Sequence, residues 1–274
     1  MVVAVLAIAL VLAIWRPWQS DPSGGPAEPP TTPSGTPTSG ESTTPQGGEE
    51  VAPGLTRGTV AVEASHSDAV YGVPVGYPQT VDGGIAAAIN YDAAGYAPAM
   101  FNKKTRAILY DRIYTSTFRA ELFTDKEWRQ FHPWANDAGQ VVDEKSGKVI
   151  DELRVISGCY PRYGAYRVIN IQPDSAQPSE ITISNWMPCV KGPGNDTDLS
   201  QVRLVWEFNT VTVRWEETDW RIAYSSSRTS RETQPEDRRV SNQTFAARAK
   251  VLGIGWQVPA DATEEALPGA VFTR

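Results

Sequence analysis

The chain has 274 residues, of which 41% are hydrophobic and 21% charged, and its formal net charge is −7. This length allows one large folded domain or a domain with an appendage. The acidic balance provides no attraction for a polyanion, so we expect no nucleic-acid partner.

The N-terminus is an apolar run. Residues 1–15 contain no charged side chain, and Trp15 and Trp18 suit a membrane interface. The run lacks the basic start and small-residue cleavage site of a secretory signal, which favours an anchor. We therefore predict a membrane anchor in residues 1–18, with these side chains toward lipid: Val2, Leu6, Ala9, Leu12 and Trp15.

Two alternatives to this anchor stay open. Fifteen helical residues span only about 22 Å, less than a bilayer core of about 30 Å. One hypothesis is therefore that the true start lies upstream of Met1 and that part of the helix is missing. The other alternative is a short buried helix of a soluble protein. Charge does not decide orientation, because Arg16 is the only charged residue beside the run.

Residues 19–54 form a predicted disordered linker. Between positions 19 and 53, 25 of 35 residues are Pro, Gly, Ser or Thr, and none is aromatic, Leu or Ile. Such a segment cannot bury enough apolar surface to offset the entropy lost on ordering. An anchor followed by a solvated linker predicts a folded domain held away from the membrane. We place that domain at residues 55–240 and a C-terminal helix and tail at 241–274.

Helical patterns come first in the domain. Thr80 can cap a helix that runs through Ile85 and Ala88 toward Met100. Glycines 83 and 84 and the many alanines indicate close packing of this helix. Asn102 can cap a second helix, and Thr124 or Asp125 begins a third that Pro133 ends. We expect the second helix to turn these residues toward the core: Ile108, Leu109 and Ile113.

Strand patterns follow. Apolar and polar residues alternate at 165–172, 180–190 and 201–216, and the alternation changes phase at Asn209-Thr210, which predicts a bulge or bend. Residues 216–219 have turn chemistry, and 220–224 return as an antiparallel partner. A polar loop at 225–239 and a short helix at 242–252 complete the chain. Helices before strands indicate an α+β fold.

Three segments resemble a known group. Residues 72–80 (GVPVGYPQT), the alanine-rich helix with 88–91 (AINY) and the 213–222 hairpin (VRWEETDWRI) are similar to mostly uncharacterised, membrane-anchored actinobacterial proteins. Those proteins are often found with conjugative elements. The resemblance covers residues 70–226 and implies helices on a curved antiparallel sheet, the cone of ketosteroid isomerase and cystatin-like domains. Inner-membrane scaffolds of VirB and Tcp type in type IV secretion use that fold.

The two cysteines, Cys159 and Cys189, lie beside or in the predicted sheet. In an extracytoplasmic protein an isolated pair is most simply one disulfide, and two separate buried thiols are the alternative. Neither Cys-x-x-Cys spacing nor a histidine cluster is present, so we expect no metal and no cofactor. The disulfide and the polar linker together favour an extracytoplasmic domain on a single-pass anchor.

No residue pattern singles out catalysis, and we expect no enzyme. His66 lies in a polar run, and His132 lies at a helix end where a cation would suit the dipole. No nucleophile motif accompanies either histidine. An isomerase-like site with a buried carboxylate near tyrosines remains the alternative. Its candidate residues are Asn90, Tyr91, Asp92, Tyr110 and Asp111.

A partner surface is expected on two parts of the chain. Lys103, Lys104 and Arg106 begin a basic stretch, for which a solvated helix face is the alternative. Trp186 and Trp256 adjoin loops and are expected at the surface, whereas Trp206 and Trp215 are expected in the core. We expect the partners to be the membrane and other cell-envelope proteins, and a homo-oligomer is compatible with the sequence.

These patterns leave two hypotheses. The first is a non-catalytic interaction module in a cell-envelope or conjugative transfer assembly. The second is a domain that binds or isomerises an apolar small molecule inside the cone.

Overall fold

The computed structural model describes residues 48–122, 124–228, 234–235 and 244–265. The predicted anchor at 1–18 and linker residues 19–47 lie outside these residues, whereas Glu50–Ala52, predicted as disordered linker, form a short strand of the main sheet. Across the described ranges no helix combines the length and the apolar character needed to span a membrane.

The described elements include short strands and helices before four long strands. In chain order they are β1 (Glu50–Ala52), β2 (Leu55–Arg57), β3 (Asp68–Val70), β4 (Val73–Val75), α2 (Val81–Ala94), η1 (Pro98–Phe101), α3 (Lys103–Ile113), α4 (Ser116–Arg119), α5 (Asp125–Phe131), β5 (Arg154–Cys159), η2 (Pro161–Tyr163), β6 (Ala165–Gln172), β7 (Glu180–Gly194), β8 (Arg203–Glu216), β9 (Asp219–Ser227), α6 (Phe245–Leu252) and β10 (Trp256–Val258). Mixed helices and strands agree with the α+β prediction.

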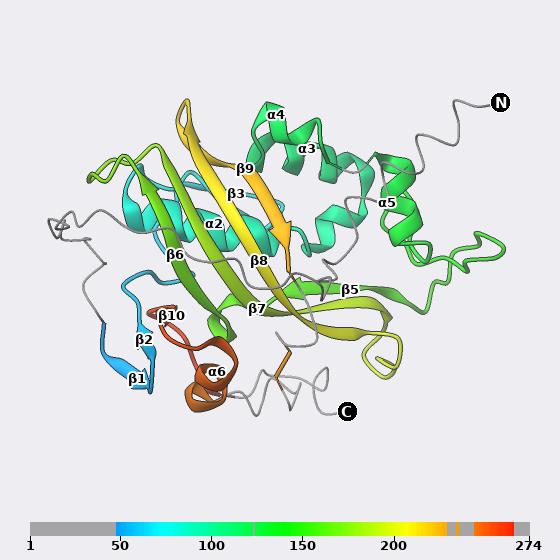
Figure 1. The fold of residues 1–274 in the computed structure, drawn as a ribbon. Coiled ribbons are helices and arrows are strands. Elements are labelled where there is room, and N and C mark those ends of the chain that lie inside the picture. Colours follow the sequence, from blue (N-terminus) through cyan, green and yellow to red (C-terminus); the bar gives the residue numbers. More distant parts are fainter. Residues whose placement is uncertain (1–47, 123, 229–233, 236–243, 266–274) are drawn as a thin grey trace, which may run out of the picture. The chain divides into compact units, whose positions relative to one another are not determined.

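Eight of the described strands form one sheet, in the order β1-β2-β10-β6-β7-β8-β9, with β5 paired to β7 (Figure 1). Strand β7 is long enough to pair β6 along its first half and β5 along its second half. On its other edge it pairs β8 along almost its whole length. Apart from β10 with β2, the pairs in this sheet are antiparallel.

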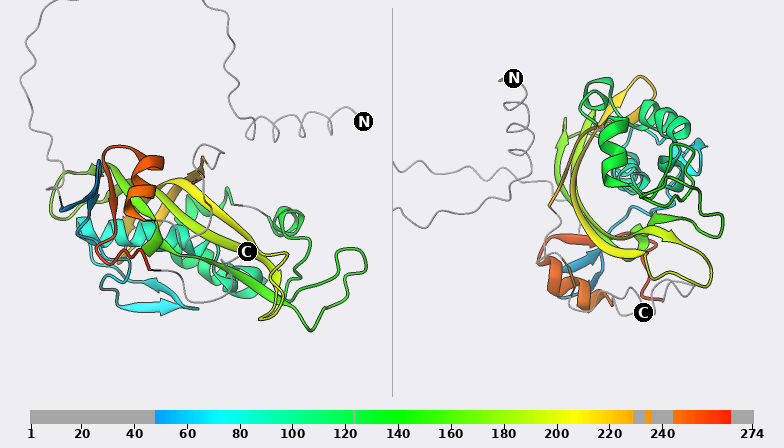
Figure 2. Two further views of the ribbon diagram at one scale, coloured as in Figure 1. Left: turned by 90° about the horizontal axis from the view of Figure 1, so that it is seen from below. Right: turned by 90° about the vertical axis from the view of Figure 1, so that its right-hand side faces the viewer.

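The sheet is curved, with helices α2, α3 and α4 inside the curve (Figure 2). On this concave side, Ile181 and Val213 pack with Ile89 of α2 in one core cluster. On the other side, Trp186 and Trp206 stack with ring centroids 4.1 Å apart and share a second cluster with Trp256. Both faces of the sheet are therefore covered.

No bulge lies at the change of alternation at Asn209-Thr210, so the bulge offered as one explanation was wrong. Pairing of β8 with β7 continues without a register shift through both residues. Before this point the apolar residues of β8, such as Trp206, face the outer cluster, whereas Val211 and Val213 face the inner one. The alternation in the sequence changes phase because the buried apolar side chains of β8 switch from the outer face of the sheet to its inner face. The register shift of β8 falls three residues later, in its pairing with β9.

Helix α2 is shorter than the sequence predicted, and it lies very close to the sheet. The hydroxyl of Thr80 accepts a hydrogen bond from Gly83 N at 3.0 Å and caps the helix as predicted. A Cβ on Gly84 would lie 2.5 Å from the Ile181 side chain, so only glycine permits this approach. The helix ends at Ala94 rather than near Met100, because Pro98 starts a separate turn.

Helices α3 and α5 begin where the sequence predicted, and the short α4 between them was not predicted. The Asn102 side chain accepts from Lys104 N and Thr105 N at the start of α3, and Thr124 and Glu127 form a capping box on α5. In α3, Leu109 and Ile113 are buried, but Ile108 is 48% exposed, which corrects its predicted place in the core. Leu109 and Ile113 are four positions apart and share a face that Ile108 does not.

The C-terminal segment belongs to the same sheet. Thr244 caps α6, and β10 lies between β2 and β6. Arg248 of α6 is fully buried, and its guanidinium donates to the carbonyl oxygens of Gly164 and Thr263. Residues 244–265 therefore pack on the domain and help to cover the outer face of the sheet.

Candidate functional site

A row of polar residues interrupts the apolar concave face of the sheet. On β7 the residues facing α2 change from Ile181 and Ile183 to Asn185 and Met187, and on β8 from Val211 to Asn209 and Glu207. Antiparallel pairing places Asn185 directly opposite Asn209, and Met187 opposite Glu207. Two amides thus stand side by side where an apolar layer would otherwise continue.

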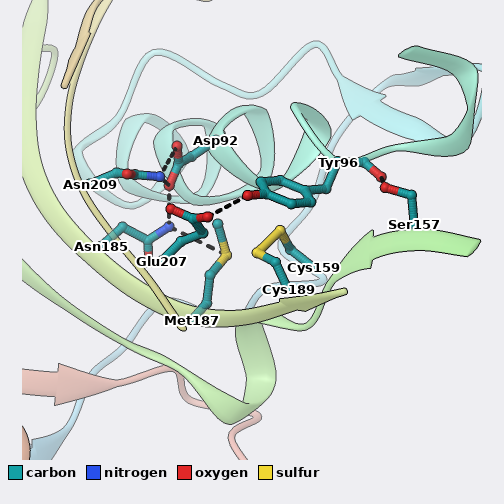
Figure 3. Close-up of a disulfide and its surroundings, with 9 residues drawn as sticks. All are labelled: Asp92, Tyr96, Ser157, Cys159, Asn185, Met187, Cys189, Glu207 and Asn209. Carbon is teal, nitrogen blue, oxygen red and sulfur yellow. Dashed lines mark hydrogen bonds between the residues drawn. A yellow bond between two sulfur atoms is a disulfide. The ribbon is translucent and has the colours of Figure 1, made fainter. Parts of the chain in front are cut away.

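Asp92, near the end of α2, points onto this pair of amides (Figure 3). Its Oδ2 accepts from Asn185 Nδ2 at 3.0 Å, and its Oδ1 and Oδ2 accept from Asn209 Nδ2 at 3.0 and 3.2 Å. Among the described residues, no cation pairs with Asp92. We call Asp92, Asn185, Asn209 and Glu207 the polar cluster.

The environment of Asp92 raises its pKa to about 7. Desolvation by the surrounding protein is the largest cause, and the negative charge of Glu207 adds to it. The hydrogen bonds from Asn185 and Asn209 act in the opposite direction. Asp92 as a whole residue is partly buried. Such a group can exchange a proton near neutral pH.

Glu207 connects the polar cluster to Tyr96, whose hydroxyl donates to Glu207 Oε1. Burial and the charges of Glu207 and Asp92 raise the pKa of this tyrosine, so it stays protonated. The Nζ of Lys191 lies 5.4 Å from the centroid of the Tyr96 ring and 3.3 Å from His132 Nε2. The concave face thus carries two carboxylates at one end and an ammonium group further along.

His132 is not the helix-end cation that its position suggested. Burial and the nearby Lys191 lower its pKa to about 4, so the imidazole is neutral at physiological pH. Its Nδ1 lies 3.0 Å from the Trp128 carbonyl oxygen, which fits a proton on Nδ1 and leaves Nε2 to accept from Lys191. His66 is exposed, as expected.

The disulfide lies on the same face. Cys159 of β5 and Cys189 of β7 are cross-strand neighbours and are bonded, as the spacing and the expected compartment favoured. Ser157, two residues earlier, donates through its hydroxyl to the carbonyl oxygen of Tyr96 at 2.7 Å. The disulfide ties β5 to β7, and the Ser157 bond ties β5 to the residues that follow α2, beside the polar cluster (Figure 3).

A second carboxylate beneath α2 is fully enclosed. Asp219, at the turn between β8 and β9, is 1% exposed and forms an ion pair with Arg112 Nη2 at 3.2 Å. It also accepts hydrogen bonds from these donors: Tyr91 Oη, Gly76 N and Trp220 N. Asp219 therefore ties α2, α3 and the loop after β4 to the hairpin.

The structure separates the residues of the isomerase-like alternative. Tyr91 donates to Asp219, Asn90 donates to the Val62 and Ala86 carbonyl oxygens, and Asp111 is exposed and paired with Arg119. Only Asp92 joins the polar cluster. The sequence reasoning missed its partners, although Asn185, Asn209 and Glu207 are polar residues at positions of the inner-face parity.

The predicted partner surface needs correction. Trp186 and Trp256 are buried, because both faces of the sheet are covered. Arg106 is also buried; it donates to the Met100 carbonyl oxygen and lies over the Trp128 ring at 4.1 Å. Lys103 pairs with Asp125 at 2.6 Å, and Lys104 is exposed. Trp206 is buried as predicted, and Trp215 is partly buried.

Within the described residues, no group of three or more His, Cys, Asp or Glu side chains could hold a metal ion. The polar cluster has two carboxylates and two amides, which suits hydrogen bonding and proton exchange. No protein family, curated protein or solved structure matches the chain.

Proposed function

We propose that this chain is a single-pass, membrane-anchored protein whose domain lies outside the cytoplasm and acts without catalysis in a cell-envelope assembly, such as a conjugative transfer apparatus. The apolar run at 1–15 and the polar linker support the anchor and the spacing. Helices inside a curved sheet, with the long strands β6–β9 after them in the chain, support the ketosteroid-isomerase and cystatin-like cone of secretion scaffolds. The family assignment rests on the sequence resemblance.

One observation carries the location, the disulfide between Cys159 and Cys189. Disulfides persist in oxidising compartments and are rare in the cytosol. The described residues contain no free cysteine. A chain that uses both cysteines in one bond is suited to the outer side of a membrane, where the linker would present the domain to envelope partners.

Thiol labelling in intact cells tests the location. A membrane-impermeant maleimide should label the wild-type protein only after an impermeant reductant is added outside, and a variant with both cysteines changed to serine should not label. Labelling that needs cell lysis and no reductant would place the domain inside. Removing residues 1–18 should release the protein from the membrane fraction.

Crosslinking tests the assembly role. Crosslinking in cells that carry the transfer genes, followed by purification from solubilised membranes, should recover envelope proteins with the wild-type chain. The variant lacking residues 1–18 is the matched control and should recover none. A wild-type chain that stays monomeric and without envelope partners would contradict the proposal.

A second candidate function is a small-molecule site on the concave face. The observation that favours it is Asp92, a partly buried residue whose carboxyl group has a pKa near 7 and contacts two amides. Carboxylates with strongly raised pKa values gather at binding and catalytic sites. The test is a ligand screen by NMR, in which saturable shifts at Asn185 and Asn209 would support the site.

A further inference from the structure

Helix α5 is attached to the rest of the domain mainly through one side chain. Of its seven residues only Trp128 is buried. The Trp128 ring meets the Phe101 ring of η1 with centroids 5.3 Å apart, and the Arg106 guanidinium lies over it at 4.1 Å. At the start of the helix, Asp125 pairs with Lys103 and Arg106 of α3. A short helix with one buried side chain opens more easily than the core of the domain.

His132 closes the other end of α5. Its ring stacks on the Trp128 ring with centroids 4.2 Å apart, and it meets the Phe101 ring edge-on at 5.2 Å. Its Nδ1 donates to the Trp128 carbonyl oxygen at 3.0 Å, and its Nε2 accepts from Lys191 Nζ at 3.3 Å. Because Lys191 belongs to β7, His132 joins α5 to the middle of the main sheet.

A second proton on the imidazole is incompatible with this junction. An imidazolium carries a proton on both nitrogens, so Nε2 no longer accepts from Lys191 and instead faces its ammonium group. Arg106, which lies over the Trp128 ring, is a second cation that acts on His132. Burial is the largest cause that lowers the pKa of His132 to about 4, and the charges of Lys191 and Arg106 add to it. The bond to the Trp128 carbonyl oxygen acts in the opposite direction.

The charged and titratable groups around His132 come from several elements. They are Lys103 and Arg106 of α3, Asp125 and Glu127 of α5, Tyr96 after α2, Lys191 of β7, and Arg203 and Glu207 of β8. Hydrogen bonds hold the pKa of Asp125 and that of Glu127 below their ordinary values, so both stay ionised at pH 5. Asp92 of α2 titrates near pH 7, but it destabilises the fold as pH rises, which is the opposite sign to His132.

We propose that His132 and Lys191 form an acid-sensitive switch, in which protonation of the imidazole separates α5 from β7 and uncovers the Trp128 and Phe101 rings. The neutral imidazole holds α5 against the sheet, and the charged imidazole repels Lys191. The stabilisation of the closed form is complete above pH 6.5 and is lost as pH falls toward 4. This inference is independent of the proposed role in an envelope assembly and of the small-molecule site.

Hydrogen–deuterium exchange followed by mass spectrometry tests the switch in the full chain, held in detergent micelles. Between pH 7.5 and pH 5 we expect the opening constant of peptides from α5 to rise about 30-fold, after correction for the intrinsic pH dependence of exchange. Peptides from α2 report on the core and should show no parallel rise. Unchanged protection in α5, or an equal loss in α5 and α2, would overturn the proposal.

The two histidines of the chain provide a matched pair of variants. His132→Gln leaves a side chain that does not titrate, so the protection of α5 should become independent of pH, whatever its absolute level. His66→Gln changes an exposed histidine in the same way and should keep the rise of about 30-fold. A folded His132→Gln protein that still opens α5 in acid would contradict the proposal, and so would loss of the response in His66→Gln.

Proton NMR of the His132 imidazole gives a test that does not require the His132→Gln protein to fold. In the wild type we expect a midpoint near pH 4. Lys191→Met removes the cation and keeps the length of the side chain, so the midpoint should move up toward 6.5 and the opening of α5 in acid should become weaker. A wild-type midpoint near 6.5, or one that Lys191→Met leaves in place, would overturn the switch.

Discussion

Asp92 on α2 and Asp219, which contacts α2 through Tyr91, differ in how the surrounding protein compensates their negative charge. Asp219 is enclosed and has an arginine partner, two backbone N–H donors and the Tyr91 hydroxyl. Asp92, the residue after Tyr91, contacts only neutral amides and lies beside Glu207. Tyr91 and Asp92, which are neighbours on α2, thus belong to two different arrangements. Tyr91 donates to a carboxylate that has a cation partner, whereas Asp92 is a carboxylate without one among the described residues.

The difference separates a structural role from a binding role. Burying a carboxylate is costly unless a cation and donors replace the lost water. Asp219 has these partners within the fold, and it joins four segments of the chain. For Asp92 the cost of burial appears as a raised pKa, because no cation among the described residues pairs with its carboxyl group. An unmatched carboxylate can gain from a change that supplies a counter-charge, whereas a matched one cannot.

The largest expected effect is at Asp219. Asp219→Asn leaves the partly buried Arg112 without its counter-charge and weakens the bonds from Gly76 and Tyr91. We expect a loss of about 2–4 kcal/mol in the free energy of unfolding, measured by urea denaturation. The control Asp111→Asn removes an exposed pair with Arg119 and should cost less than about 1 kcal/mol. Equal losses of unfolding free energy in the two variants would show that the contacts of Asp219 stabilise the fold no more than an exposed ion pair does.

Asp92→Asn should have the opposite sign. Between the ordinary value of 3.8 and about 7, the folded state keeps a proton that the unfolded chain releases. The contribution of Asp92 therefore lowers stability as pH rises through this window and is fully unfavourable above pH 7. We expect the variant to equal the wild type near pH 4 and to be about 1–3 kcal/mol more stable at pH 8.

The difference between these two proteins isolates Asp92. His132, with its lowered pKa, makes both less stable as pH falls below its ordinary value of 6.5, and this contribution cancels in the comparison. Denaturation at four or five pH values measures the difference. A variant less stable than the wild type at pH 8 would assign Asp92 the same structural role as Asp219.

The hydrogen bonds from Asn185 and Asn209 should lower the pKa of Asp92. Asn185→Ala removes a hydrogen bond that favours the ionised carboxyl group, so the pKa of Asp92 should rise further. Carbon-13 NMR of the Asp92 carboxyl signal measures this. The neighbouring Ser184→Ala, on the opposite face of β7, should leave the pKa unchanged. A fall in the Asn185→Ala protein would contradict the assigned hydrogen bond.

The smallest effect is expected at Glu207. Glu207→Gln removes the like charge that disfavours ionisation of Asp92, while the amide oxygen can still accept from Tyr96. The pKa of Asp92 should fall slightly, because desolvation and not Glu207 is the main cause of its shift. The same NMR titration detects the change, and a rise would show that the two carboxyl groups do not repel.

The sequence predicted local features better than the polar cluster. Thr80 and Asn102 were recognised as caps, and Thr124 was one of two candidates for the third helix, because a cap depends on residues three or four positions away. Strand 165–172 was predicted with its observed bounds. The phase change in β8 was misinterpreted because α6 and β10, far along the chain, cover the outer face.

The cluster itself required the register of two strands. Asn185 and Asn209 are 24 positions apart and become neighbours only through the pairing of β7 with β8. Asp92 reaches them because Gly84 lets α2 approach Ile181 and Trp220 of the sheet. The sequence named Asp92 among five candidates, but it gave no means to choose between Asp92 and its neighbours.

The most direct test is a carbon-13 NMR titration of the wild-type Asp92 carboxyl group. The contrast between the two aspartates predicts a midpoint near pH 7. A midpoint near 4 would show that the charge of Asp92 is already matched and would contradict the account.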